Sequence, residues 1–188
     1  MSEILKNAAI IATEVHKDQK RACGQEKYIE HCKRVSGMLA RDFPRYADDN
    51  TLAAAILHDT LEDCPFQSYT EVYATIANKC NPVVAAYVEL LTKPRDHRDY
   101  SNMRYLNRLA ISPANIQTIK ALDRIDNLLS MTNVNWPMPR MVHYIEDSNK
   151  IREILFANNL TTQAELLNVQ IVAATSRVAT IAISQKHG

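Results

Sequence analysis

Apolar side chains recur at spacings of three and four residues along most of the chain, which is the period of an amphipathic α-helix. In the first third of the chain these stripes predict helices over about 2–19, 28–43 and 48–64. Pro44 and Pro65 end the second and third helices, because the residue before a proline is pushed out of the helical conformation. Asp48, Asp49 and Asn50 are good N-cap candidates for the third.

The same pattern continues to the end of the chain. We expect further helices over about 68–79, 82–92, 101–110, 112–131, 140–157 and 161–185. A loop at 132–140 contains Trp136 and two prolines, and no segment shows the alternation typical of a strand. The predicted fold class is all-α, a single-domain helical bundle.

Composition excludes several functions. Three glycines in 188 residues are too few for a dinucleotide or P-loop phosphate cradle. A net charge of +1 lacks the basic excess of a duplex-binding surface, so we expect no nucleic-acid partner. Four cysteines without a C-x-x-C pair, no signal segment, and a last apolar run interrupted by Arg177 predict a cytoplasmic protein with no membrane span.

Four ionisable residues crowd the end of the third predicted helix: His58, Asp59, Glu62 and Asp63. The spacing of four places Glu62 on the face of His58, and Asp63 on the face of Asp59. Three carboxylates beside an imidazole favour the binding of a cation, because like charges are costly when partly buried. The alternative is a solvated helix end with a chance His-Asp pair.

Two other predicted helices carry matching residues at inward-looking positions, His31 and Asp123. Two imidazoles and two carboxylates suit Mn²⁺, Fe²⁺, Zn²⁺ or Mg²⁺ better than a metal that prefers thiolates. The alternatives are a hydrogen-bonded core histidine at His31 and an ion pair of Asp123 with Lys120 or Arg124.

The order His31, then His58-Asp59, then Asp123 resembles the HD-domain metal-dependent phosphohydrolases. The details look most like the hydrolase domain of the RelA/SpoT family and its small stand-alone alarmone hydrolases. The similarity runs from about residue 7 to 150. Its strongest parts are His16–Arg21 with Gly24, Tyr28–His31, Ala54–Asp63 and Ile119–Leu128. The resemblance implies one HD hydrolase domain over 1–188 without a synthetase half, with the helices of 140–185 packing on it.

The resemblance also implies the chemistry. His31, His58, Asp59 and Asp123 would hold one divalent ion, commonly Mn²⁺, and Glu62 and Asp63 match the catalytic acidic pair. The implied activity is that of a guanosine-3′,5′-bis(diphosphate) 3′-pyrophosphohydrolase of the stringent response, which releases pyrophosphate from ppGpp or pppGpp and leaves GDP or GTP.

Five residues match the family's substrate contacts: Arg21, Lys93, Asn127, Arg140 and Tyr144. A small nucleotide is therefore the expected partner, and an oligomer is left open. Departures such as Ala22 after the base-stacking arginine, and Asp126 in place of a frequent histidine, affect the nucleotide pocket and leave the metal ligands intact. Two alternatives follow, a phosphohydrolase acting on another nucleotide phosphate and a catalytically silent alarmone sensor.

Overall fold

The computed structural model describes residues 1–65, 68–94, 101–131 and 136–184. All secondary-structure elements in these residues are helices. In chain order these elements are α1 (Glu3–Val15), α2 (Tyr28–Asp42), the 3₁₀ turn η1 (Pro44–Tyr46), α3 (Asp49–Leu57), α4 (Thr60–Asp63), α5 (Tyr69–Lys79), α6 (Pro82–Leu91), α7 (Ser101–Ala110), α8 (Ala114–Ser130), α9 (Met138–Ala157) and α10 (Thr161–Ser184). The predicted all-α class is confirmed.

The chain divides into two compact units, residues 1–119 and 120–188, with the division inside α8. The predicted packing of the helices of 140–185 on the rest of the chain stays a prediction, as does the single hydrolase domain over 1–188.

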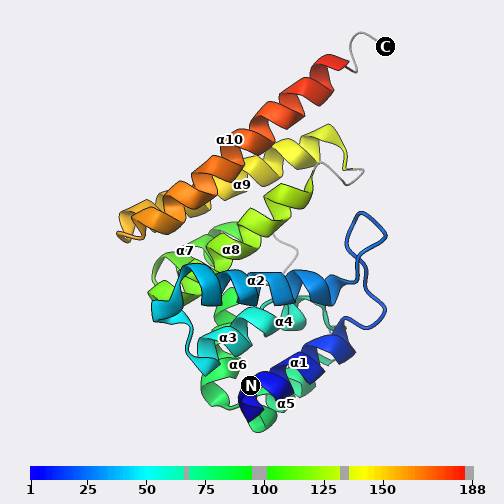
Figure 1. Ribbon diagram of the computed structural model, residues 1–188, viewed down its shortest axis with the longest axis vertical. Helices are drawn as coiled ribbons and strands as arrows, with labels where there is room; N and C mark the ends of the chain where they lie inside the picture. Colours follow the sequence, from blue (N-terminus) through cyan, green and yellow to red (C-terminus); the bar gives the residue numbers. More distant parts are fainter. Residues whose placement is uncertain (66–67, 95–100, 132–135, 185–188) are drawn as a thin grey trace. The chain divides into compact units, whose positions relative to one another are not determined.

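In the first unit, α3 packs against α1, α2 and α6, and α5 packs on α6 and α1 (Figure 1). Three consecutive alanines, Ala53 to Ala55, are fully buried in α3 and let neighbouring helices approach closely. Larger aliphatic side chains of α2, α3 and α6, such as Leu39, Leu57 and Val88, are also fully buried. This central helix leads directly to His58 and Asp59.

One helix boundary corrects the sequence prediction. A single third helix reaching Cys64 is wrong, because α3 ends at Leu57 and the short α4 begins at Thr60. His58 and Asp59 connect the two with backbone angles still in the right-handed region, and the Asp63 N–H still donates to the Asp59 carbonyl at 2.9 Å. Neither glycine nor proline marks this break.

Smaller differences lie at the ends of other elements. α1 ends at Val15, four residues before the predicted end, and α9 begins at Met138 rather than at 140. Between α1 and α2, an isolated antiparallel bridge joins Lys20 to Lys27, and Gly24 turns the chain with a φ of 77°. A positive φ of this kind favours glycine. Part of the predicted 132–140 loop, residues 132–135, lies outside the described residues.

In the second unit, α10 packs along α9 (Figure 1). By length and composition alone α10 could cross a membrane, which is weak evidence because core helices of soluble proteins pass the same test. Arg177 interrupts its apolar sequence and donates a hydrogen bond to the Leu128 carbonyl of α8 at 3.1 Å. Leu166, Val169 and Val172 are exposed on α10.

Capping at the start of α3 should contribute measurably to stability. The Asp48 carboxylate accepts from the backbone N–H groups of Asn50 and Thr51 at 3.0 and 3.1 Å. We expect Asp48→Ala to lower the free energy of unfolding by about 1 kcal/mol, which is a melting temperature lower by about 2–4 °C. Differential scanning calorimetry measures it. The control Asp49→Ala removes a neighbouring carboxylate and should cost less, and equal losses would contradict the capping role.

Candidate active site

Three of the four predicted metal ligands meet within the first unit. His31 comes from the first turn of α2, and His58 and Asp59 from the break between α3 and α4. The two Nε2 atoms lie 3.2 Å apart, and Asp59 Oδ2 is 3.0 Å from His58 Nε2 and 3.7 Å from His31 Nε2. His31 and His58 are 0% and 2% exposed. A buried cluster of nitrogen and oxygen ligand atoms is therefore present.

Neighbouring groups hold the rings and the carboxylate in place. His58 Nδ1 lies 2.9 Å from the Ala55 carbonyl, which only accepts hydrogen bonds, so Nδ1 carries the hydrogen. The Nε2 lone pair of a neutral His58 then faces the cluster, as in metal-binding histidines whose other nitrogen donates to the protein. The Tyr28 hydroxyl donates to Asp59 Oδ2 at 2.6 Å and its ring meets His31 edge-on.

This donor set fits a divalent cation. The ligand atoms of His31, His58 and Asp59 all lie within 4.8 Å of one another, and each residue can offer one of them. Imidazole nitrogen combined with carboxylate oxygen suits Mn²⁺, Fe²⁺ and Zn²⁺. The cluster is thus a candidate metal site, and its donors do not select one of these ions.

The predicted acidic pair lies on α4, one turn beyond the cluster. Glu62 Oε2 accepts a hydrogen bond from the backbone N–H of Lys93 at 2.9 Å, just after α6. Asp63 Oδ2 accepts from Gln19 Nε2 at 2.8 Å. Partial burial raises the pKa of Asp63, and the Asp59 charge raises it further, whereas Gln19 and His16 act in the opposite direction. Each carboxylate is thus held by a separate donor.

Two predicted substrate contacts also belong to this unit. The Arg21 guanidinium lies over the Tyr28 ring, 5.7 Å from its centroid, and Arg21 is 9% exposed. Because the Tyr28 hydroxyl bonds Asp59, Arg21 is placed near the cluster of His31, His58 and Asp59. Lys93 follows the end of α6, and its main chain bonds Glu62. The Arg21 side chain and the Lys93 main chain therefore lie beside residues expected to carry the chemistry.

The fourth predicted ligand, Asp123, lies on α8 in the second unit. Its Oδ2 is 2.7 Å from Lys120 Nζ, and its Oδ1 accepts from Asn127 Nδ2 at 2.6 Å. The ion pair with Lys120 that the sequence left open is present. Asn127, a predicted substrate contact one turn later on α8, thus holds one oxygen of the predicted ligand.

The two remaining predicted contacts, Arg140 and Tyr144, belong to a row of guanidinium and aromatic groups in contact with one another in the second unit. The Arg140 guanidinium lies 4.1 Å from the centroid of Trp136, whose ring centroid is 5.4 Å from that of Tyr144. The Arg124 guanidinium lies over the Tyr144 ring, 4.2 Å from its centroid. Guanidinium and aromatic faces attract each other in this geometry. Arg140 and Tyr144 are therefore held by a shared aromatic neighbour.

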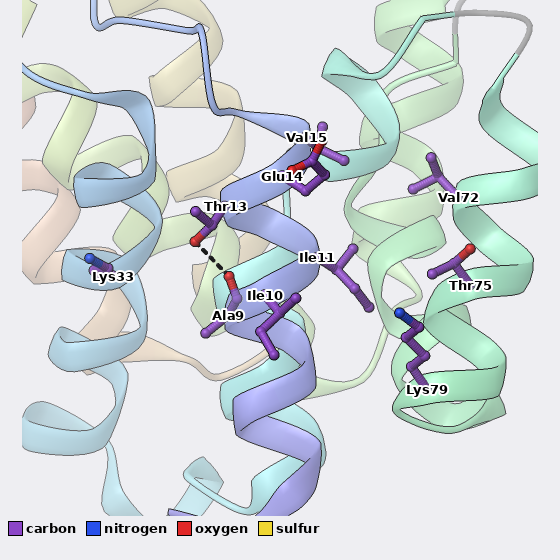
Figure 2. Close-up of a pocket in the computed structure, with 10 residues that line it drawn as sticks. All are labelled: Ala9, Ile10, Ile11, Thr13, Glu14, Val15, Lys33, Val72, Thr75 and Lys79. Atoms are coloured by element: carbon purple, nitrogen blue, oxygen red, sulfur yellow. Dashed lines mark hydrogen bonds between the residues drawn. The ribbon is translucent and has the colours of Figure 1, made fainter.

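A separate pocket of about 730 Å³ opens between α1 and α5 (Figure 2). Its lining is largely aliphatic and includes Ile10, Ile11 and Val72, with Lys79 at α5. None of the predicted site residues lines it. The pocket lacks the paired carboxylates and imidazoles that the candidate site contains, so it is not the site of the predicted chemistry.

Sequence reasoning left the roles of several neighbours unassigned. Tyr28 lies three residues before His31 on the same helix, and this spacing signals a shared face. Nothing local in the sequence indicated that its hydroxyl would reach Asp59. Trp136 is the chain's single tryptophan. Its position in a proline-containing loop carried no periodic signal to show which side chains it would meet.

Comparison with known proteins fits this geometry. The HD domain family matches residues 8–162, which include both histidines, Asp59, Asp123 and the acidic pair. The match covers most of the chain, and the chain therefore belongs to the HD domain family.

The relatives are longer proteins. Over 129 residues the chain is 27% identical to the bifunctional (p)ppGpp synthase/hydrolase SpoT of Escherichia coli K12, covering 68% of this chain and 18% of SpoT. It is 30% identical over 125 residues to the probable chloroplastic GTP diphosphokinase RSH3 of Arabidopsis thaliana, covering 64% of this chain and 17% of that protein. The chain thus spans less than a fifth of these curated relatives.

A solved structure shares the fold over nearly the whole chain. It is that of a metazoan ortholog of SpoT that hydrolyses ppGpp, with a TM-score of 0.76 and 21% identity, and the match covers 94% of this chain and 96% of the other. At this identity the likeness establishes the fold.

The raised pKa of Asp63 predicts how metal-free stability depends on pH. The pKa of Asp63 is higher in the folded protein than in the unfolded chain, so ionising Asp63 lowers the free energy of unfolding. This loss is complete at pH values above the folded-state pKa. The loss disappears at pH values below the pKa of Asp63 in the unfolded chain, because Asp63 is then protonated in both states. We expect Asp63→Asn to raise the melting temperature of the EDTA-treated protein at pH 7, and the gain to shrink as pH falls toward about 4. The control Asp18→Asn changes an exposed carboxylate, and a pH-independent gain at Asp63 would contradict the prediction.

Proposed function

We propose that the protein is a metal-dependent guanosine-3′,5′-bis(diphosphate) 3′-pyrophosphohydrolase that converts ppGpp or pppGpp to GDP or GTP and pyrophosphate. The observation that carries this proposal is the convergence of His31, His58 and Asp59, with two separately held carboxylates one turn further on. Membership of the HD domain family and the activities named for SpoT and its metazoan ortholog support it.

For the metal, we propose one divalent ion, Mn²⁺, held by His31, His58, Asp59 and Asp123, which together make a donor set that could bind a metal. When bound, such an ion lowers the pKa of water and neutralises charge on a phosphoryl oxygen. Asn127 would orient the Asp123 carboxylate, because its amide already donates to Oδ1. Tyr28 would do the same for Asp59.

The acidic pair supplies the proton chemistry. A carboxylate of Glu62 or Asp63 orients the attacking water and takes its proton as the water oxygen bonds to the phosphorus on the ribose 3′ oxygen. The bond between that phosphorus and the 3′ oxygen breaks, the 3′ oxygen receives a proton, and pyrophosphate leaves. Partial burial, reinforced by the Asp59 charge, raises the pKa of Asp63, which makes its carboxylate a stronger base than a fully exposed one.

The remaining predicted residues would bind the nucleotide. Arg21, already packed on an aromatic ring, can present its planar guanidinium to a base. Arg140 and Lys93 would pair with phosphate oxygens, and Tyr144 and Asn127 would contact the nucleoside. Phosphates are then bound by side chains and metal, as a chain with three glycines requires. We place this activity in the cytoplasm, without a nucleic-acid or membrane partner.

The direct test incubates the purified, metal-stripped protein with Mn²⁺ and a panel of nucleotides, and measures released pyrophosphate and nucleotide products. We expect ppGpp and pppGpp to give pyrophosphate plus GDP or GTP. Turnover of another nucleotide alone would replace this function with that of a different HD phosphohydrolase. Tight binding of ppGpp without turnover would instead identify a sensor.

Removing one carboxylate should separate chemistry from binding. We expect Glu62→Gln to lower kcat for ppGpp by about 10²- to 10⁴-fold, the range for losing a general acid or base. Mn²⁺ affinity, measured by isothermal titration calorimetry, should remain close to that of the wild type. Glu71→Gln on α5 is the matched control. Unchanged turnover in the Glu62 variant would remove Glu62 from the mechanism and leave Asp63 as the only carboxylate of the pair that could take the proton.

Arg140 should act mainly on substrate affinity. Charge-assisted hydrogen bonds contribute about 1.5–3 kcal/mol, so Arg140→Ala should raise KM for ppGpp by at least about tenfold with a smaller change in kcat. Steady-state kinetics measure both constants. Arg45→Ala removes an exposed guanidinium that stacks on Tyr46 and serves as the control. Equal KM values for both variants would contradict a phosphate contact at Arg140.

A further inference from the structure

A buried histidine and a glutamine after α1 form a hydrogen-bonded pair that ends on Asp63. His16 Nδ1 lies 2.6 Å from Gln19 Oε1, and Gln19 Nε2 donates to Asp63 Oδ2 at 2.8 Å. The direct separation of His16 Nδ1 from Asp63 Oδ2 is 3.9 Å. All three residues belong to the first unit. Gln19 thus links a fixed ring to a carboxylate 44 residues later in the chain.

The chemistry of the groups fixes the direction of both bonds. An ionised Asp63 carboxylate only accepts hydrogen bonds, so Gln19 must present its NH₂ group to it. The amide oxygen of Gln19 therefore faces His16, and His16 Nδ1 must carry the hydrogen of that bond. A reversed amide would bring oxygen against oxygen at Asp63. The tautomer of His16 and the orientation of Gln19 are thus set together.

The histidine is held firmly at some cost to the fold. His16 is 1% exposed, and its Nε2 has no hydrogen-bond partner among the described residues. Burying a polar atom without a partner is unfavourable, so packing alone does not account for an imidazole here. The ring stacks on Tyr28, with centroids 4.9 Å apart and planes at 29°. Its hydrogen bond to Gln19 is the contact that requires a polar group.

Gln19 is held through its main chain as well. Its N–H donates to the His16 carbonyl at 3.1 Å, and its own carbonyl accepts from the Tyr28 N–H at 3.0 Å. The side chain therefore starts from a fixed backbone position. By contrast, Asp63 ends a four-residue helix, and its side chain is 27% exposed. Without a partner, that carboxylate would be free to rotate.

We infer that Gln19, oriented by His16, is a positioning residue that fixes the Asp63 carboxylate with one oxygen occupied and the other directed to the reaction. The inference rests on the proposed function, which gives Asp63 its catalytic role. Neither Gln19 nor His16 touches substrate in this scheme. Their removal should affect the chemical step while binding of nucleotide and metal stays intact.

The kinetic test uses the full chain loaded with Mn²⁺. Gln19→Ala should lower kcat for ppGpp by about 10- to 100-fold, the loss expected when a reacting group is displaced by roughly 1 Å. KM and Mn²⁺ affinity should remain near wild type. In an Asp63→Asn background the same substitution should add no further loss, because interacting residues are not additive. The control Gln25→Ala changes an exposed glutamine in the same loop and should leave kcat unaltered.

A second series keeps or removes the donor that orients Gln19. His16→Asn retains an N–H donor near the position of Nδ1 and should preserve most of kcat, whereas His16→Ala should lower it as Gln19→Ala does. If the alanine variant fails to fold, the partly exposed Gln19 still provides the test. A kcat for Gln19→Ala equal to wild type, or an equal loss in the Asp63→Asn background, would overturn the inference.

A readout independent of turnover separates this inference from the proposed function. Crystal structures of wild type and Gln19→Ala should show Asp63 in one orientation in the first and displaced or in several orientations in the second. An unchanged Asp63 carboxylate in the variant overturns the positioning role, whatever the activity. If wild type hydrolyses no ppGpp, the proposed function fails, and the two crystal structures still decide whether Gln19 positions Asp63.

Discussion

The central constraint on this protein is that two imidazole rings and a carboxylate are packed closely together with little exposure to solvent. Two imidazole nitrogens 3.2 Å apart face a carboxylate oxygen at 3.0 and 3.7 Å. At low local dielectric such groups repel unless hydrogen or a cation lies among them. The Ala55 carbonyl holds the His58 ring, and the Tyr28 hydroxyl holds the Asp59 carboxylate. A divalent cation bound among these donors would turn the repulsion into attraction, which is why the cluster is the candidate active site.

The fold holds this cluster through its central helix. Three buried alanines allow α3 to lie close to α1, α2 and α6, so His31 on α2 can reach His58. The break after Leu57 then places His58 and Asp59 outside regular helix while the chain continues into α4. The helices on either side of this break therefore position the candidate ligands His31, His58 and Asp59, and the short α4 carries Glu62 and Asp63.

Much of this organisation could be predicted from the sequence. Apolar periodicity predicted the helices, since burial of one face determines where a helix forms. The break at His58 could not be predicted, because its backbone angles remain helical and no glycine or proline marks it. Residues within a motif, such as His31 and Asp59, could be nominated in advance. Their partners could not, because contacts such as that of Tyr28 with Asp59 join positions 31 residues apart.

The two carboxylates of α4 are held by different kinds of donor, a main-chain N–H for Glu62 and a side-chain amide for Asp63. This difference determines which substitutions elsewhere in the chain can affect each carboxylate. Glu62 accepts from a main-chain N–H after α6, a donor that almost any residue would supply at that position. Asp63 depends on the side chain of Gln19, and through it on the ring of His16. Only the arrangement around Asp63 requires particular side chains, at Gln19 and at His16. A substitution of the partly exposed Gln19 can therefore alter Asp63 while α2 and α3, which position His31 and His58, keep their packing.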